Sequence, residues 1–246
     1  MSLRFIGSML SVEVGKLKIA WNASPKGQPV LSRVGTPLER LRVGSVVDTS
    51  GLMADFVLAE ANGSFVKDPG MQLTCCAYGC VLNVNGSFTI HRFYLRGIEA
   101  DQSRVLQVMT QGGVGVVEGE TKLLQSLTEI VPETPEDWAM WLEEHVEGGD
   151  MKPPLIGGDK LNWGDISYDR TLGGSARSIK PINYHESVYH DPVARPRVED
   201  SQSMQYHRAI GGEYEFLYLS AVHTDSEAWV EAHVGIAIDP NRLIVI

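Results

Sequence analysis

The fold is decided by the stretch Val81-Leu82-Asn83-Val84-Asn85-Gly86-Ser87-Phe88-Thr89-Ile90-His91-Arg92-Phe93-Tyr94. Its two arms are rich in apolar and β-branched residues and flank Asn85-Gly86. Asn and Gly both accept the positive φ of a type I′ turn, so this dipeptide between alternating segments is the strongest short-range signal of a β-hairpin. The sequence therefore predicts an antiparallel hairpin here.

Further strands are predicted on both sides of this hairpin. The alternation of apolar and polar residues predicts strands at Leu10–Val14, Leu17–Trp21, Val105–Met109, Val114–Val117, Met204–Ala209, Tyr214–His223 and Val230–Ile238. The apolar run Leu243–Ile246 is expected to be a buried strand. Residues 150–196 are rich in Gly, Pro, Asn and Asp, which favours short strands separated by long loops.

One helix is predicted near the middle of the chain. Thr134 can cap it, Pro135 suits its first position, and Glu136 and Asp137 favour the positive end of the helix dipole. One face would carry Trp138, Trp141, Leu142 and His145, and Gly148-Gly149 would end the helix.

These elements predict an α+β, mostly β protein. Two β-rich, meander-like or barrel-like halves, residues 1–131 and 150–246, would flank the amphipathic helix within residues 132–149. A single continuous domain is the alternative. An internal duplication is also possible, because Gly86 and Arg92 in Val81–Gly113 recur as Gly164 and Arg170 in Lys160–Gly212. If it is real, both glycines should lie in hairpin turns.

Charge and cysteine content narrow the class of protein. The formal net charge is −10, with 31 acidic and 21 basic residues. This balance argues against nucleic acid and against an anionic membrane surface, because both bind mainly through Lys and Arg. There is neither a signal-peptide pattern nor an apolar run of transmembrane length. Together with three closely spaced cysteines, which form no disulfide framework, this predicts a cytoplasmic protein without a transmembrane segment.

Motifs for metal, cofactor or covalent chemistry are weak. The thiols of Cys75, Cys76 and Cys80 lack a fourth zinc ligand, and neighbouring residues on a strand point to opposite faces, so buried free thiols are expected. His185, His190 and Asp191 form a second cluster, which only a bent loop could bring to one ion. No nucleotide-binding loop and no nucleophile motif is present. We therefore predict neither metal nor cofactor.

The predicted helix region is strongly acidic. Between Val131 and Asp150 there are seven acidic residues and no Lys or Arg. One interpretation is a solvated face opposite two tryptophans, Trp138 and Trp141, that pack into the core. The other is a surface that steers a basic partner, with these residues as candidates for partner binding: Glu136, Asp137, Glu143, Glu144 and Glu147.

Several short motifs resemble the YjfK-like family of uncharacterised bacterial proteins. They lie between Gly79 and Ile246 and include Arg92-Phe93-Tyr94, Leu106-Gln107-Val108, Trp138, Trp141, Tyr168-Asp169-Arg170, Glu186 and Tyr189. The first 78 residues match poorly. The resemblance implies a bacterial cytosolic factor linked to membrane stress, and it supplies no catalytic residue. Within the pattern we expect Arg92, Tyr94, Asp169 and Arg170, with the two tryptophans, to be structural anchors.

The leading functional hypothesis is a non-enzymatic protein-interaction or assembly module that binds a protein partner or a second copy of itself. One alternative is an enzyme with a loop-built site around His185, His190, Asp191 and Asp169. Another is a small-ligand binder that uses strands in which Arg adjoins aromatic residues, such as Arg92-Phe93-Tyr94.

Overall fold

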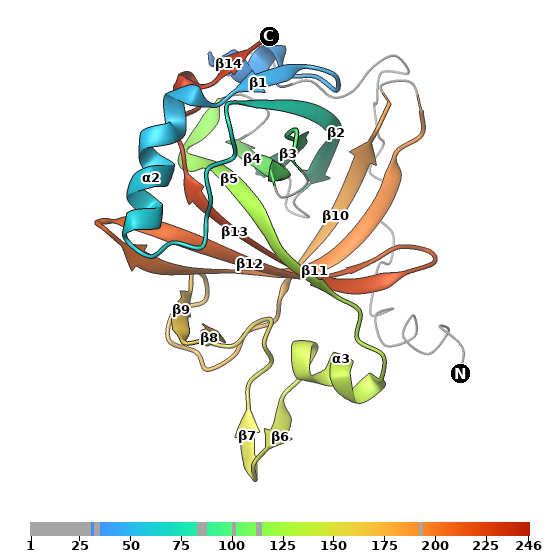
Figure 1. Ribbon diagram of the computed structural model, residues 1–246. Coiled ribbons are helices and arrows are strands. Elements are labelled where there is room, and N and C mark those ends of the chain that lie inside the picture. Colours follow the sequence, from blue (N-terminus) through green and yellow to red (C-terminus); the bar gives the residue numbers. More distant parts are fainter. Residues whose placement is uncertain (1–30, 32–34, 83–87, 100–101, 112–114, 192–193) are drawn as a thin grey trace.

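Antiparallel strands close into a barrel (Figure 1). The computed structural model describes residues 31, 35–82, 88–99, 102–111, 115–191 and 194–246. Within these residues the barrel has eight strands. It is closed by β10, which pairs with β11 on one side and with β2 on the other. In that order they are β2 (Gln72–Leu82), β3 (Phe88–Arg96), β4 (Arg104–Gln111), β5 (Val116–Ile130), β13 (Ala228–Ala237), β12 (Glu213–His223), β11 (Arg197–Ile210) and β10 (Ile182–Tyr189).

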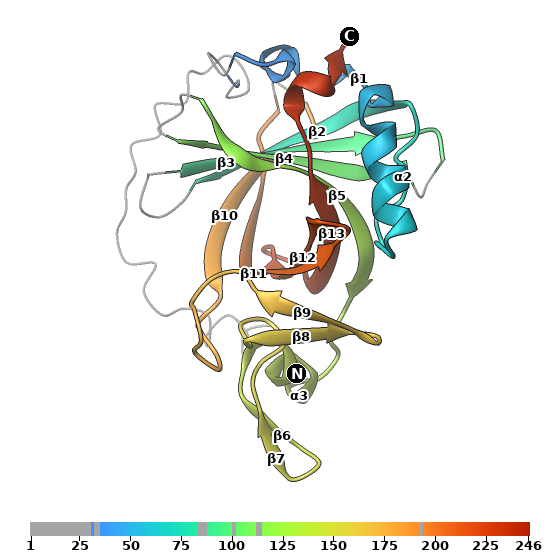
Figure 2. The same cartoon turned by 90° about the vertical axis from the view of Figure 1, so that its left-hand side faces the viewer.

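Shorter elements surround the barrel (Figures 1 and 2). They are the 3₁₀ turns η1 (Pro37–Arg40), η2 (Ser50–Leu52) and η4 (Pro240–Arg242), the helices α2 (Met53–Ala61) and α3 (Pro135–Leu142), and the strands β1 (Val46–Asp48), β6 (His145–Glu147), β7 (Asp150–Lys152), β8 (Lys160–Trp163), β9 (Ile166–Arg170) and β14 (Ile244–Val245). Strands β14 and β1 extend the sheet beside β2, while the β8–β9 hairpin pairs with the end of β11. The β6–β7 hairpin forms a sheet of its own.

The prediction of a mostly β protein is confirmed, and strands from both predicted halves lie in one barrel. The strands β2 and β3 pair as predicted, with Val81 opposite Ile90. The turn between them, and the strands predicted at residues 10–14 and 17–21, lie outside the described residues. At Gly164, with φ of 59°, the chain turns between β8 and β9 as the duplication requires. Whether the two segments superpose stays a prediction.

The prediction for the C-terminal run Leu243–Ile246 was only partly right. Leu243 is buried, but Ile244 and Ile246 are 57% and 71% exposed. The reason is the alternation of side chains along an extended segment: Leu243 and Val245 pack on the main apolar cluster, so Ile244 and Ile246 point to solvent.

The helix begins where the sequence predicts but ends earlier. Thr134 and Asp137 form a reciprocal capping box at the start of α3. The helix stops at Leu142, because Glu143 is already extended with φ of −129°. The expected continuation to Gly148 was wrong. Gly148 and Gly149, with φ of 61° and 90°, instead form the turn of the β6–β7 hairpin.

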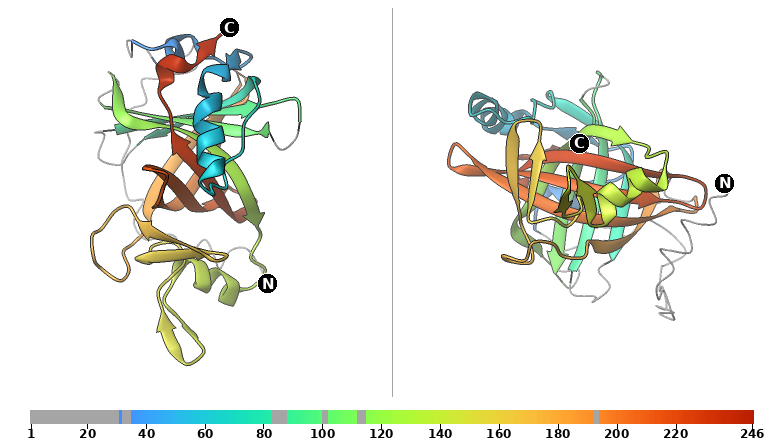
Figure 3. Two further views of the ribbon diagram at one scale, coloured as in Figure 1. Left: turned by 60° about the vertical axis from the view of Figure 1, so that its left-hand side comes forward. Right: turned by 90° about the horizontal axis from the view of Figure 1, so that it is seen from below.

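The two faces of the barrel wall differ in polarity. Gln107 Nε2 on β4 donates to Tyr218 Oη on β12 at 3.3 Å, although β5 and β13 separate these strands. Such a contact must cross the barrel, so this face lines the interior. The adjoining side chains Leu106 and Leu217 point to the other face, where they belong to the main apolar cluster together with Phe56 of α2 and Trp141 of α3. Figure 3 shows these covering elements outside the strands.

A buried carboxylate attaches part of this outer layer to the barrel. Glu215 of β12 has no exposed surface. It accepts hydrogen bonds from Tyr168 Oη at 2.6 Å, from Arg208 Nε at 2.7 Å, from the backbone N–H of Phe65 at 2.8 Å, and from the Ser64 hydroxyl. Because these four donors come from three segments of the chain, this one group joins the chain after α2 to β9 and β11.

A buried histidine joins three strands of the barrel wall. His91 Nδ1 lies 2.7 Å from Tyr78 Oη, and its Nε2 lies 3.1 Å from Thr110 Oγ1, which in turn donates to the Thr89 carbonyl. These partners fit a neutral ring that accepts at Nδ1 and donates at Nε2. Burial lowers the pKa of His91 to about 4.

We therefore expect acid to destabilise the protein through His91. In the unfolded chain the His91 ring has an ordinary pKa of ~6.5. The stability that the neutral ring contributes to the fold is therefore fully present above that pH and is lost as the pH falls toward 4. The loss should be on the order of 2–3 kcal/mol. Urea unfolding from pH 7 to pH 4.5 measures it. His91→Gln should flatten this part of the profile, and an unchanged slope would contradict the assignment.

Candidate functional site

One lobe projects from the barrel and contains the predicted acidic surface. This acidic lobe, residues 133–152, consists of α3 and the β6–β7 hairpin, and it lies at the lower end of the molecule in Figures 1 and 2. Trp141 anchors it, being 7% exposed within the main apolar cluster. Trp138 was expected to be equally buried but is only half-buried against that cluster. The backbone N–H groups of Leu155 and Ile156 also donate to the carbonyls of Met140 and Trp141.

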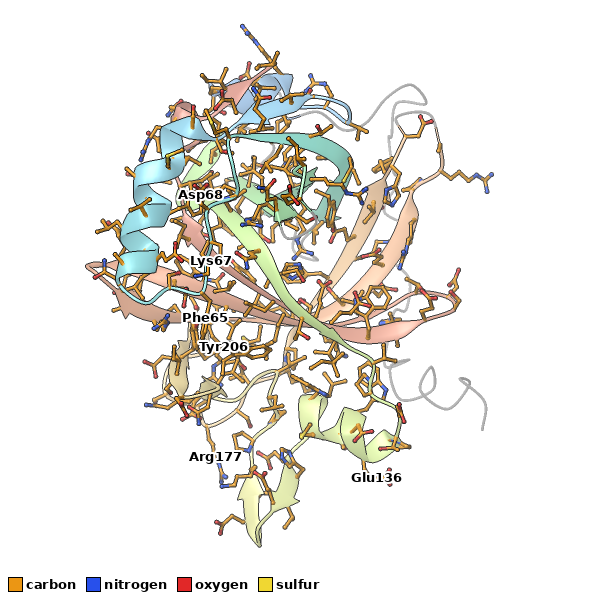
Figure 4. The ribbon with its side chains drawn as sticks, in the orientation of Figure 1. Phe65, Lys67, Asp68, Glu136, Arg177 and Tyr206 are labelled. Carbon is orange, nitrogen blue, oxygen red and sulfur yellow. The ribbon has the colours of Figure 1, made fainter. Side chains whose placement is uncertain are left out.

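The acidic side chains of this lobe face solvent. All five candidate residues are exposed: Glu136, Asp137, Glu143, Glu144 and Glu147. Figure 4 shows Glu136 on the outer side of α3. Asp137 is engaged in the helix cap, where hydrogen bonds from Thr134 lower its pKa. Glu144 accepts from Ser178 Oγ at 3.2 Å. Their exposure leaves these charges free to act on an approaching molecule.

Apolar side chains are exposed beside these acids. Val146 is 68%, Met151 50% and Met140 39% exposed. Sequence reasoning missed this feature because it extended the helix to Gly148. The signal was present, since Gly148-Gly149 between Val146 and Met151 is a hairpin pattern. The lobe therefore combines charge with exposed apolar area, as the centre and rim of a protein interface do.

The histidine cluster proposed for a loop-built site is divided between separate places. His185 lies on β10, where its Nδ1 is 2.7 Å from Asp200 Oδ1 of β11. His190 and Asp191 follow the end of β10 and are exposed. Asp169 lies on β9 opposite His207 of β11, seven positions beyond Asp200, which is about 23 Å along a strand. The described residues contain no group of three His, Cys, Asp or Glu side chains arranged to hold a metal ion.

The remaining anchors differ in their surroundings. Arg170 is buried and donates to the carbonyls of Gly157, Leu172 and Ala176, each at 2.6 Å, so it holds the loop that follows β9. Asp169 is exposed, with its carboxylate 3.6 Å from Lys160 Nζ.

The other two anchors form a network inside the barrel. Arg92 Nη1 donates to Glu186 Oε2 at 2.7 Å, and Tyr94 Oη donates to Glu186 Oε1 at 2.8 Å. Arg92 Nε also donates to Gln107 Oε1 at 3.2 Å. Burial opposes the charge on Arg92, but Glu186 and other neighbours more than offset this effect and raise its pKa. Burial and Glu186 likewise raise the pKa of Tyr94, so the phenol remains a donor.

This interior leaves little room for a ligand. The cavity beside Arg92 and Tyr218 has a volume of about 20 Å³, enough for roughly one water molecule. Both oxygens of Glu186 are already occupied by donors. The network therefore acts first as a structural element of the barrel.

The cysteines are buried free thiols, as predicted for Cys75 and Cys80, whereas Cys76 is half-buried. Burial raises the pKa of Cys75 to about 12 and that of Cys80 to about 11. At neutral pH both groups stay protonated, which makes them poor nucleophiles and poor metal ligands.

Comparison with known proteins gives a family. A family model described as "Protein of unknown function (DUF2491)" matches residues 24–243, and the chain belongs to this family. The match includes most of the first 78 residues, where the resemblance seen in the sequence was weak. No curated protein and no solved structure matches the chain.

No helix in the described part of the chain has the length and apolar character that crossing a bilayer requires.

We predict that Arg92 and Glu186 stabilise the fold only as a pair. Arg92→Met should cost about 3–5 kcal/mol in the free energy of unfolding, because it leaves the carboxylate of Glu186, 5% exposed, without its counter-charge. The double variant with Glu186→Met removes both charges and should recover most of this loss. Urea denaturation followed by circular dichroism measures both. A single variant that costs less than about 1 kcal/mol would be incompatible with a closed interior.

The two tryptophans should differ in their contribution to stability. Trp141→Ala should cost about 3–5 kcal/mol, because it empties a buried site in the apolar cluster. Trp138→Ala should cost clearly less, because part of its ring is already exposed. Thermal unfolding of the two variants provides the comparison. Equal losses would mean that α3 packs differently against the barrel.

Proposed function

We propose that this protein is a non-enzymatic protein-interaction or assembly module that binds a basic partner protein through its acidic lobe. The observation that supports this proposal is the exposure of Val146 and Met151 next to Glu143, Glu144 and Glu147 on a projecting hairpin. Exposed apolar area marks a surface that gains by being covered. The surrounding carboxylates select which surface can cover it, because like charges are repelled.

The charges and the apolar side chains have separate roles in this proposal. Acidic groups steer a basic partner during diffusion and set its orientation. Val146, Met151 and Met140 supply the contact that excludes water and slows dissociation. The proposal therefore predicts an association rate that depends on salt and a dissociation rate that depends on these apolar residues.

The lobe is held in shape before any partner arrives. Arg177 donates from its guanidinium to the carbonyl of Met151, and Figure 4 shows it beside the hairpin. The capping box fixes the start of α3, and Trp141 fixes its inner face. A preformed surface loses less conformational entropy on binding, which favours recognition by this part of the chain.

The proposal also includes the cellular location and the biological role of this interaction. The three closely spaced cysteines, which are free thiols, support a cytoplasmic location, and the YjfK-like motifs described above support a bacterial role linked to membrane stress. A second copy of the chain is the other partner that the proposal allows. Affinity purification from native lysate, followed by mass spectrometry, would identify the partner.

We predict that reversing the charge of Glu136, Glu143, Glu144 and Glu147 to Lys separates binding from stability. The four side chains are exposed, so the melting temperature should change little. Association with the basic partner should slow by about tenfold or more, and added salt should weaken binding of the unmodified protein. Stopped-flow or surface plasmon resonance measures both effects.

A matched control reverses four exposed acids elsewhere on the barrel, namely Glu99, Glu118, Asp225 and Glu227. It changes the net charge equally but should leave the association rate much closer to that of the unmodified protein. A partner whose affinity ignores both the reversal on the lobe and the salt concentration would contradict the proposal.

A further inference from the structure

Helix α2 has an apolar face that no described element covers. Its inner face packs on the barrel through Phe56 and Ala59. On its outer face Met53 is 40%, Val57 58% and Leu58 57% exposed. Ala54 and Ala61 are exposed on the same side. We call these five residues, Met53, Ala54, Val57, Leu58 and Ala61, the α2 stripe. Their spacing of i, i+1, i+4, i+5 and i+8 places them within one face along the whole helix.

A groove adjoins this stripe. It has a volume of about 290 Å³ and lies between α2, the β11–β12 turn and the end of β13. The buried apolar residues of its lining are Ala59, Ile210, Ile236 and Ile238, each less than one-tenth exposed. Leu58 belongs both to the stripe and to the groove. The two features therefore form one continuous apolar surface with a depression in it.

Some charged groups at the rim of the groove already have partners within the protein, and others are exposed to solvent. Arg242 is engaged, because its Nη1 lies 2.6 Å from Asp55 Oδ2 and its Nη2 donates to the Gly51 carbonyl. The Asp239 carboxylate accepts from the backbone N–H of Asn241 at 2.9 Å. Glu213 is exposed at the rim.

Glu213 suits a cation, because a carboxylate pairs with Lys or Arg. The sole cation in the groove lining, Arg242, is already neutralised by Asp55. A ligand for this surface therefore needs an apolar part and, beside it, a positive charge.

We propose that the α2 stripe and its groove bind an amphipathic α-helix of a partner protein, which inserts an aliphatic side chain into the groove and places a Lys or Arg against Glu213. A straight stripe along a helix of about 13 Å is complementary to a second helix, which packs at an axial distance of roughly 8–10 Å. An aliphatic anchor fills the depression, as in other helix-in-groove complexes.

This surface is distinct from the acidic lobe. In Figure 1 α2 lies on the upper left flank of the barrel, whereas α3 and the β6–β7 hairpin lie at its lower end. The inference deepens the proposed interaction function by assigning it a second surface. It can nevertheless fail or succeed independently, because the two surfaces share no residue.

The experiment uses the whole protein and synthetic helical peptides of about five turns. The first peptide has Leu and Lys arranged with a helical period. The second has the same composition in scrambled order, and the third has Glu in place of Lys. Fluorescence anisotropy of the labelled peptides gives the affinities, and amide chemical shifts of the protein locate the binding surface. We expect the first peptide to bind at least about tenfold more tightly than the other two, with shifts centred on α2 and residues 210–214.

Two variants and a control assign the contacts. Leu58→Glu and Glu213→Lys each should weaken the first peptide by about tenfold or more. Both positions are exposed, so both variants should keep the melting temperature of the unmodified protein. The control Val146→Glu makes the same kind of change on the acidic lobe and should leave the affinity unchanged.

Several results would overturn the inference. Equal binding of the scrambled peptide would show attraction by net charge alone, and a loss of binding in Val146→Glu would assign the peptide to the acidic lobe. Sedimentation velocity that shows dimers dissociated by Leu58→Glu would assign the stripe to a second copy of the chain. Flotation with uncharged phosphatidylcholine vesicles, abolished by the same variant, would assign it to a lipid surface.

Discussion

The ion pair between Arg92 and Glu186 inside the barrel is the interaction on which the rest of the structure depends. Glu186 lies on β10, the strand that closes the barrel by pairing with both β2 and β11. Its carboxylate is buried among Arg92 and Tyr94 of β3, so any opening of β10 would separate this buried pair of charges. Gly79 of β2 lies between them, and a Cβ there would lie only 1.8 Å from Glu186 Oε1. A side chain at this point of the wall would displace the Glu186 carboxylate from the position in which it meets Arg92 and Tyr94.

Because the interior of the barrel is polar, the outer face of its wall is apolar and must be covered. Because Arg92, Gln107 and Tyr218 occupy the inside, the alternating apolar residues point outward and need a covering layer. Helix α2, helix α3 and the β8–β9 hairpin supply part of this layer, and Glu215 bonds one section of it to the wall. The α2 stripe lies on one of these covering elements, and the acidic lobe consists of another, α3, with the β6–β7 hairpin. The barrel thus serves as the rigid body that holds the surfaces apart.

The sequence predicts the positions of the strands better than it predicts which side of each strand faces the barrel interior. Alternation identifies β2, β3, β4 and β11 to β13, but an alternating pattern does not say which side is inside a barrel. Arg92 stands out beside aromatic residues, yet its partner Glu186 is 94 positions away and no local pattern connects them. Helix α2 escaped prediction because its sequence is apolar on the outer face as well as the inner one, which hides the helical period. The end of α3 was missed because Gly148-Gly149 was predicted to end the helix, whereas the backbone N–H groups of Leu155 and Ile156, which are not local, donate to the carbonyls of its last turn. The candidate site was predicted in its acids, and its exposed hairpin was missed although Gly148-Gly149 signals it.

Hydrogen–deuterium exchange of the backbone amides of β10 tests the closed barrel most directly. If β10 pairs on both sides, the amides of residues 186–188 must exchange as slowly as those of the central strand β12, through opening of the whole domain. If the barrel is instead an open sheet, the amides on one side of β10 will exchange as fast as those of the edge strand β14. The account predicts the first result, and the second would contradict it.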